Sequence, residues 1–225
     1  MKVSDLDTRG LKIKANQKTR YLLDGEEELL LAELDPTRII NGCASYGQRT
    51  ALTQRKLQDQ YDLVVFLLDT GARYSEVAEV PWSAIDRMDW KYINLYREKV
   101  GNEGNLTVTN RLREILERRF RETNSPYVFA SLDDPSKPRG YATKGIRNAI
   151  KRAGLNADHL VKRYGKFTPH SLRHKFASRL VQGGMSLYAV SKLLGHSSES
   201  MTKRYAFLSP SMVANQAADI LNGRG

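Results

Sequence analysis

Residues 168–205 read TPHSLRHKFASRLVQGGMSLYAVSKLLGHSSESMTKRY, and the helix signals in this stretch decide the fold of the C-terminal half of the chain. Its proline stands where the first turn of a helix tolerates proline, which predicts a helix over 169–180. The sequence VQGG at 181–184 ends that helix, and a second helix is predicted over 185–194, where a glycine follows. A third short helix is expected to carry Tyr205.

Four side chains of this stretch have the chemistry of a reactive site. His170 and Arg173 are three residues apart on the first helix, so they share one face. His196 follows the second helix, and Tyr205 lies on the third. Imidazoles, a guanidinium and a phenol brought together from three helices suit the transfer of a phosphoryl group to a protein hydroxyl.

The spacing of these residues also resembles that of a known family. H-x-x-R-H at 170–174, then L-G-H ending at His196, then a tyrosine nine residues later, resemble the tyrosine recombinases, the phage-type integrases. Upstream, TGARYSEV contains Arg73 and REKVGNEG contains Lys99. The resemblance extends over residues 21–208, and several spaced motifs in the right order make it specific.

The resemblance implies a catalytic set and a reaction. The set is Arg73, Lys99, His170, Arg173, His196 and Tyr205. By this resemblance Tyr205 attacks a DNA phosphate and forms a 3′-phosphotyrosyl bond, while the two arginines bind the phosphate oxygens. Lys99 protonates the leaving 5′ oxygen, His170 shuttles a proton and His196 contacts the phosphate. The bond energy is kept in the enzyme–DNA link, so neither ATP nor a metal is implied.

The residues alone leave more ordinary interpretations open. Arg73 follows a helix end and could be a surface ion-pair partner of Asp69 or Glu76. Lys99 could be a lysine on an exposed hairpin, where lysines discourage edge-to-edge pairing. Tyr205 could be a half-buried core tyrosine, with a phenol pKa of about 10 in the absence of neighbours. We expect cations from Arg73, Arg173 and His196 to favour its ionisation.

A metal site and the two histidines without an assigned role must also be considered. His170 and His174 are four residues apart, a spacing that can hold a metal, but the residues between them include Arg173 and no glutamate, which disfavours a metal site. His174 is expected to be a supporting residue that packs or bonds to backbone. His159 lies outside every motif and is predicted to be a surface residue.

The charge distribution points to nucleic acid. The chain has a net charge of +11, and residues 136–205 contain 15 of its 36 Lys and Arg but two of its 25 Asp and Glu. Basic residues that merely solubilise helix faces would be interspersed with acidic ones. The candidate DNA contacts are Lys144, Arg147, Lys151, Lys203 and Arg204. The expected partners are duplex DNA and further recombinase protomers.

Composition also bounds the compartment. The single cysteine, Cys43, excludes an internal disulfide and a cysteine metal cluster. The sequence contains no run of eighteen apolar residues and begins without the apolar stretch of a signal peptide. These features predict a cytoplasmic protein without a membrane partner.

The rest of the chain predicts an α+β fold, a mostly α-helical catalytic domain with a small antiparallel hairpin sheet. Residues 1–20 are expected to be a linker or N-terminal extension and 21–225 the catalytic domain, without the upstream DNA-clamping domain usual in the family. Further helices are predicted over 25–34 with an Asp24–Glu27 capping box, 56–69, 75–80, 111–122 with Phe120 inward, 141–153 and 209–221, with a loop over 37–53. Strands are predicted over 92–96 and 106–109, with 82–85 as a possible third. The last helix could pack on its own domain or on a neighbouring protomer.

Two other functions are compatible with parts of the sequence. The segments 186–194 and 199–205 could form a helix-turn-helix in a non-catalytic DNA-binding protein, but this leaves Arg73 and Lys99 unexplained. A type IB topoisomerase resembles this chain in its arginine, lysine, histidine and tyrosine chemistry. The LLGHSS sequence and its short distance to Tyr205 favour the recombinase.

Overall fold

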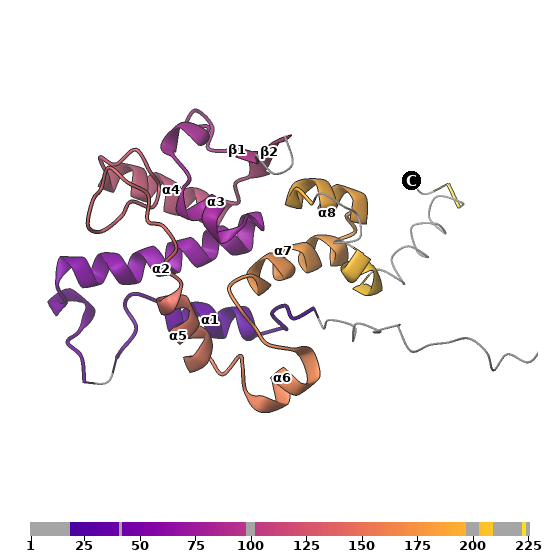
Figure 1. The fold of residues 1–225 in the computed structure, drawn as a ribbon, viewed down its shortest axis with the longest axis horizontal. Helices are drawn as coiled ribbons and strands as arrows, with labels where there is room; N and C mark the ends of the chain where they lie inside the picture. The colour runs from indigo at the N-terminus through magenta and orange to yellow at the C-terminus, as the bar shows by residue number, and fades with distance from the viewer. Residues whose placement is uncertain (1–18, 41, 98–101, 197–202, 209–221, 224–225) are drawn as a thin grey trace, which may run out of the picture.

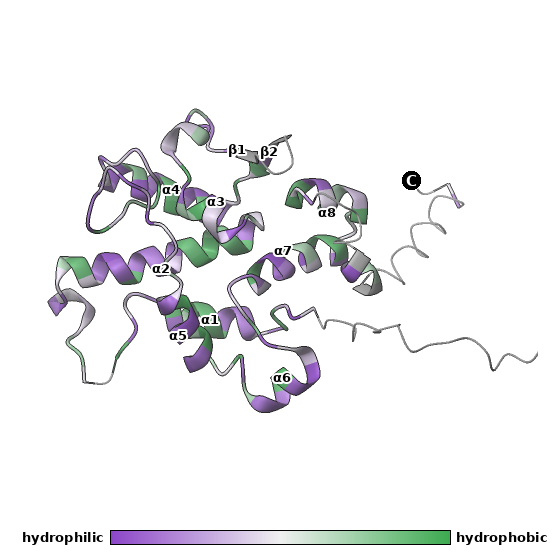
Figure 2. Ribbon diagram, in the orientation of Figure 1, coloured by the Kyte–Doolittle hydropathy of each residue, from purple (hydrophilic) through white to green (hydrophobic). Residues whose placement is uncertain are grey.

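A twenty-residue helix, α2 (Ala51–Thr70), runs through the centre of the fold (Figure 1). Every residue from Leu63 to Thr70 is buried, and Figure 2 shows this half of the helix as hydrophobic. A helix that is apolar on all sides must be surrounded by other elements. Accordingly α2 contacts α1, α3, α4, α5 and α7.

The computed structural model describes residues 19–40, 42–97, 102–196, 203–208 and 222–223. In chain order its other elements are α1 (Glu26–Leu34), η2 (Tyr46–Gln48), α3 (Tyr74–Ala78), η3 (Trp82–Ala84), β1 (Tyr92–Arg97), β2 (Asn102–Thr107), α4 (Asn110–Glu122), α5 (Lys144–Arg152), α6 (Asp158–Tyr164), α7 (Ser171–Gln182), α8 (Leu187–Leu194) and η6 (Lys203–Leu208). Lys99 and the predicted helix over 209–221 lie outside the described residues.

The arrangement is the predicted α+β one. In Figure 1, α3, α4 and the hairpin lie on one side of α2, α1, α5 and α6 lie on the other, and α7 and α8 lie near its C-terminal end. Strands β1 and β2 pair antiparallel, with Ile93 opposite Leu106, and both of these side chains are buried. Strand β2 also contacts α8, so the hairpin lies beside the motif-bearing helices.

Several element boundaries differ from the sequence prediction. Helix α2 begins at Ala51 rather than near residue 56, because the Thr50 side chain accepts a hydrogen bond from the Thr53 amide and starts the helix inside the predicted loop. The predicted Asp24 capping box is wrong. Gly25 occupies the N-cap with a φ of 79°, and Glu26 accepts from the Leu23 amide.

Three further sequence predictions, all around the hairpin, differ from the structure. The possible third strand is a 3₁₀ turn, Trp82–Ala84, followed by an isolated bridge between Ile85 and Ile93. Strand β2 starts at Asn102, earlier than predicted. Phe120, predicted inward, is partly exposed and meets Trp82 edge-on, with ring centroids 5.1 Å apart.

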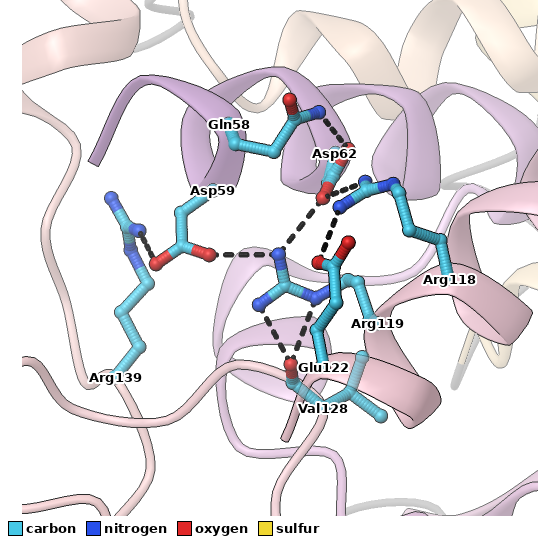
Figure 3. Close-up of polar contacts among 8 residues, drawn as sticks. All are labelled: Gln58, Asp59, Asp62, Arg118, Arg119, Glu122, Val128 and Arg139. Carbon is cyan, nitrogen blue, oxygen red and sulfur yellow. Dashed lines mark hydrogen bonds and ion pairs between the residues drawn. The ribbon is translucent and has the colours of Figure 1, made fainter. Parts of the chain in front are cut away.

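Arg119 is buried in α4, although the sequence predicts its neighbour Phe120 as the inward residue; position 119 continues the buried stripe of Leu112 and Leu116 at helical spacing. Its guanidinium lies 2.7 Å from Asp59 and 2.8 Å from Asp62 and donates to the Val128 carbonyl, as Figure 3 shows. Asp59 and Asp62 are three apart on α2 and face α4 together. Arg118 makes a second contact with Asp62, at 2.6 Å. The pairs therefore clamp α4 and the segment around Val128 onto α2.

This clamp makes a stability prediction. We expect Arg119→Leu to lower the free energy of unfolding by about 3–5 kcal/mol, because it leaves two buried carboxylates without a central partner. The matched control is Arg113→Leu, since Arg113 forms an exposed i,i+4 pair with Glu117 and should cost less than about 1 kcal/mol.

Urea unfolding measures both values from the midpoint at constant slope. Equal losses for the two arginine variants would contradict the assigned role of the clamp.

Candidate active site

Arg173 lies at the centre of the candidate site, in the first turn of α7, and is almost fully buried. One terminal nitrogen donates to the Gly71 carbonyl at 2.7 Å, and the other donates to the Leu194 carbonyl. These carbonyls stand at the C-terminal ends of α2 and α8, where the helix dipole favours a cation. Arg173 therefore joins the ends of two helices that are far apart in the sequence.

Gly71 allows α2 and α7 to approach closely. Its φ of 61° is left-handed, and a Cβ at this position would come within 2.3 Å of the Phe176 ring. Any side chain would therefore be strained by the backbone and would also collide with α7. The prediction that this glycine ends α2 is confirmed.

Two predicted site residues closely follow, in the sequence, the residues whose carbonyls accept hydrogen bonds from Arg173. Arg73 follows Gly71 by two residues and caps α3, with its guanidinium 2.7 Å from Glu76. His196 follows Leu194 by two residues, after the left-handed Gly195. The ion-pair interpretation of Arg73 is thus correct for the free protein, and Asp69 is bonded to Arg111 instead.

Tyr205 is a core residue in this structure, with 1% of its surface exposed. It packs in a small apolar cluster with Ala177, Val181, Val190 and Leu194. Its hydroxyl lies 2.5 Å from Nδ1 of His174. Of the two roles expected for His174, packing or a bond to backbone, its ring packs against those of His170 and Tyr205, and its hydrogen bond is to the phenol.

The three site histidines differ in exposure, His170 being exposed and His174 and His196 partly buried. The ring of His170 meets that of His174 edge-on with centroids 5.0 Å apart. Partial desolvation of the His170 ring by its surroundings, and then the neighbouring arginines, lower the pKa of His170. Burial also lowers the pKa of His174 to about 3 and that of His196 to about 4. His174 and His196 are therefore neutral at pH 7.

The electrostatics of Tyr205 differ from the sequence prediction. Burial raises the pKa of its phenol to about 12, against the lowering effects of Arg204 and Arg173. His196 was expected to be a cation that favours ionisation, but the neutral imidazole does not act in this way. Desolvation outweighs the cations because the phenolate would lose its water inside the apolar cluster.

A groove of about 890 Å³ opens beside Arg173. Its described lining contains five Lys and Arg and no Asp or Glu: Arg73, Arg147, Lys151, Lys166 and Arg173, with His170 among the neighbours. Helix α5 supplies two of these cations because Ile146, Ala149 and Ile150 face the core and the opposite face is basic. His174, His196 and Tyr205 are not among the described residues that line the groove.

The other predicted DNA contacts are placed less directly. Lys144 is exposed at the start of α5, outside the groove lining. Arg204 is exposed and close enough to shift the pKa of all three site histidines downward. The Lys203 side chain and the whole of Lys99 lie outside what the structure describes.

Sequence reasoning missed other groove residues. Lys166, Asn148, Asn156 and Tyr141 line it without belonging to a motif, and Tyr74 lines it from within TGARYSEV without having been singled out. The unbalanced charge of residues 136–205 was the available signal for Lys166. His159 is exposed, as predicted. Within the described part of the chain, no group of three or more His, Cys, Asp or Glu could hold a metal, and no helix is long and apolar enough to cross a membrane.

Comparison with known sequences identifies the family. A sequence profile of the phage integrase family matches residues 36–211. The chain belongs to the phage integrase family. It is 32% identical over 166 residues to tyrosine recombinase XerC of Erythrobacter litoralis, covering 71% of this chain and 50% of that protein. It is 28% identical over 172 residues to the integrase of Salmonella phage P22, covering 70% and 41%. The chain spans about half the length of these integrase-family relatives.

Solved structures show the same fold. The catalytic domain of bacteriophage HP1 integrase matches with a TM-score of 0.61 at 22% identity, covering 92% of this chain and 99% of that one. XerA recombinase matches with a TM-score of 0.63 at 21% identity, covering 93% and 66%. XerH bound to palindromic difH substrate matches at 0.64 and 19% identity, covering 94% and 56%. The integrase fold predicted from the motifs is confirmed.

The neutral histidines make a pH prediction. The unfolded chain protonates His174 and His196 near pH 6.5, whereas the folded chain does so near pH 3 and 4. Their contribution to stability is therefore complete above pH 6.5 and is lost as the pH falls toward these values. Each group should remove up to about 1.4 kcal/mol per pH unit across its own window.

Urea unfolding between pH 7 and 4.5 measures this slope. We expect His174→Asn to make it shallower, whereas His159→Asn, at an exposed site, should leave it unchanged. The same slope in all three proteins would show that His174 is protonated within the fold.

Proposed function

We propose that this chain breaks and rejoins duplex DNA strands as the catalytic part of a site-specific recombinase. One observation carries the proposal: Arg73, His170 and Arg173 share a cationic groove, and Tyr205 lies within electrostatic reach of Arg173. Membership of the phage integrase family supports it, as do relatives named tyrosine recombinases. The same membership speaks against the helix-turn-helix and topoisomerase alternatives.

In this proposal the groove binds one scissile phosphate. Arg73 and Arg173 donate to its non-bridging oxygens, since guanidinium groups stay charged and bond two oxygens at once. The phosphate must compete with Glu76 for Arg73. For Arg173 the phosphate must compete with the carbonyls of Gly71 and Leu194. Donors held in advance in this way typically contribute a few kcal/mol each to catalysis.

The chemical step exchanges one phosphoester for another. The Tyr205 oxygen bonds to phosphorus while the P–O5′ bond breaks, and the phenol proton passes to one of the site histidines, His170, His174 or His196. Lys99 is proposed to supply the proton that O5′ takes up, and His196 to contact the phosphate. The reverse reaction rejoins the strand without a nucleotide cofactor or a metal.

Tyr205 cannot attack from its buried position. Its ring must leave the cluster around Val181 and Val190, and its hydroxyl must leave His174, before the oxygen can reach a phosphate in the groove. The proposed reaction therefore requires a shift of η6. In the free protein, burial and a raised pKa keep the phenol neutral, which makes the nucleophile inert until DNA is bound.

The proposed partners are duplex DNA and other recombinase protomers, in an intracellular protein that acts at the nucleoid. Lys144, Arg147, Lys151, Lys203 and Arg204 are the proposed backbone contacts. Residues 21–225 would form the catalytic domain, preceded by a linker over 1–20.

A covalent capture experiment tests the nucleophile. We expect Tyr205→Phe to abolish protein-linked DNA on a nicked duplex that carries the target site, because the attacking oxygen is removed. DNA affinity should remain nearly unchanged. Tyr188→Phe, at an exposed tyrosine of α8, is the matched control and should capture normally.

Capture by Tyr205→Phe would assign the nucleophile elsewhere. EDTA should leave capture by the wild type unchanged, and strong inhibition would revive a metal at His170 and His174.

The groove also makes a salt prediction. The logarithm of duplex affinity should fall with the logarithm of salt concentration at a slope of about −0.9 per phosphate contacted. The double variant Arg147→Glu and Lys151→Glu should flatten this slope. Lys137→Glu, an exposed lysine paired with Asp134 outside the groove, is the control. An affinity independent of salt would exclude the groove as a DNA-binding surface.

A further inference from the structure

An exposed aromatic side chain stands in the cationic groove. Tyr141 keeps 73% of its surface exposed, yet it lines the groove together with Arg73, Arg147 and Lys151. Tyr141 has no place in the recombinase motifs, and the reaction proposed above does not use it.

Tyr74 supports Tyr141 through a contact between the two rings and a hydrogen bond to the neighbouring backbone. The two rings meet edge-on, with centroids 5.0 Å apart and planes at 67°. The Tyr74 hydroxyl accepts a hydrogen bond from the Ala142 amide at 3.0 Å, across 68 residues of sequence. The backbone next to Tyr141 is therefore attached to α3, and Tyr74 is the residue that directly follows Arg73.

The segment before Tyr141 is fixed as well. The Arg139 amide donates to the Phe129 carbonyl at 2.8 Å, and its guanidinium lies 3.5 Å from the buried Asp59. The clamp shown in Figure 3 thus extends to Arg139, two residues from Tyr141. An exposed ring supported on both sides presents its open surface with little loss of entropy on binding.

The chemistry of the groove defines what this ring can meet. Cations without carboxylates among the described lining residues favour a polyanion, and an aromatic ring among such cations favours the flat face of a nucleobase. Bases inside an intact duplex are stacked on one another. A base becomes available to Tyr141 where stacking is interrupted, as at a nick, a gap or a strand being exchanged.

We propose that Tyr141, braced by Tyr74, is a stacking platform for an unpaired nucleobase next to the phosphate held by Arg73 and Arg173. The inference rests on the proposed function, because it places DNA in the same groove. It adds a specificity: the site prefers DNA whose stacking is broken beside the scissile phosphate. Stacking carries no net charge, so this preference is independent of salt.

The test compares two duplexes of one length and sequence, one intact and one with a three-nucleotide gap. Their affinities are measured at several salt concentrations for the wild type and four variants. We expect the wild type to prefer the gapped duplex by about tenfold. Tyr141→Ala should remove the preference without changing the salt slope, and Tyr141→Phe should retain it because the ring remains.

Two further variants separate the ring from its support. Tyr74→Phe keeps the lower ring but loses the acceptor for the Ala142 amide, so the preference should fall severalfold at an unchanged salt slope. Tyr188→Ala removes an exposed tyrosine that lies beside Lys192 on α8 and should bind as the wild type does. Thermal melting confirms that each variant is folded.

The outcomes distinguish the two proposals. Absence of salt-dependent binding to either duplex by the wild type overturns the proposed function and this inference together. Normal binding without a preference for the gap, or a preference that survives Tyr141→Ala, overturns the stacking platform alone. Tyr141→Phe as weak as Tyr141→Ala would assign the contact to the Tyr141 hydroxyl, as in a hydrogen bond to a phosphate. Equal losses on both duplexes would assign its ring to a sugar.

Discussion

The buried guanidinium of Arg173 is the interaction on which the candidate site depends. By donating to the carbonyls of Gly71 and Leu194, it fixes the ends of α2 and α8 against the first turn of α7. Arg73 and His196 each stand two residues beyond one of those carbonyls. The convergence of three motifs from distant parts of the sequence is therefore a consequence of one side chain that satisfies two helix ends. Arg173 is a structural centre before it can be a phosphate ligand.

The same centre explains the electrostatics of Tyr205. Arginines surround the histidines, and burial removes the water that would solvate a further positive charge, so His174 and His196 stay neutral. A neutral imidazole can accept the hydrogen bond that the Tyr205 phenol offers. The free protein thus stores its tyrosine as a neutral core residue. Binding of a phosphate anion would favour charged histidines and change this balance.

Charged side chains are arranged differently along α2 and beyond its C-terminal end. Near the middle of α2, Asp59 and Asp62 form ion pairs with arginines of α4, so these acidic and basic groups neutralise each other inside the protein (Figure 3). Beyond its C-terminal end, the groove cations have few acidic neighbours along the chain. The excess of basic residues over 136–205 therefore becomes a local surface property rather than a diffuse net charge, which is the condition for attracting DNA.

The sequence by itself determined the order of motifs, the helices that carry them and the family to which the chain belongs. Glycine at 71 and 195 and the proline at 169 act through local backbone geometry, and the three-residue spacing of His170 and Arg173 follows from helix pitch, so each could be interpreted without a tertiary structure. Tertiary structure decided what surrounds each group. The pairing of Arg119 with Asp59, the bond of Tyr205 to His174 and the bracing of Tyr141 by Tyr74 all depend on partners that lie from 31 to 67 residues away in the chain. Burial and desolvation are set by such neighbours, and a local sequence pattern contains no record of them.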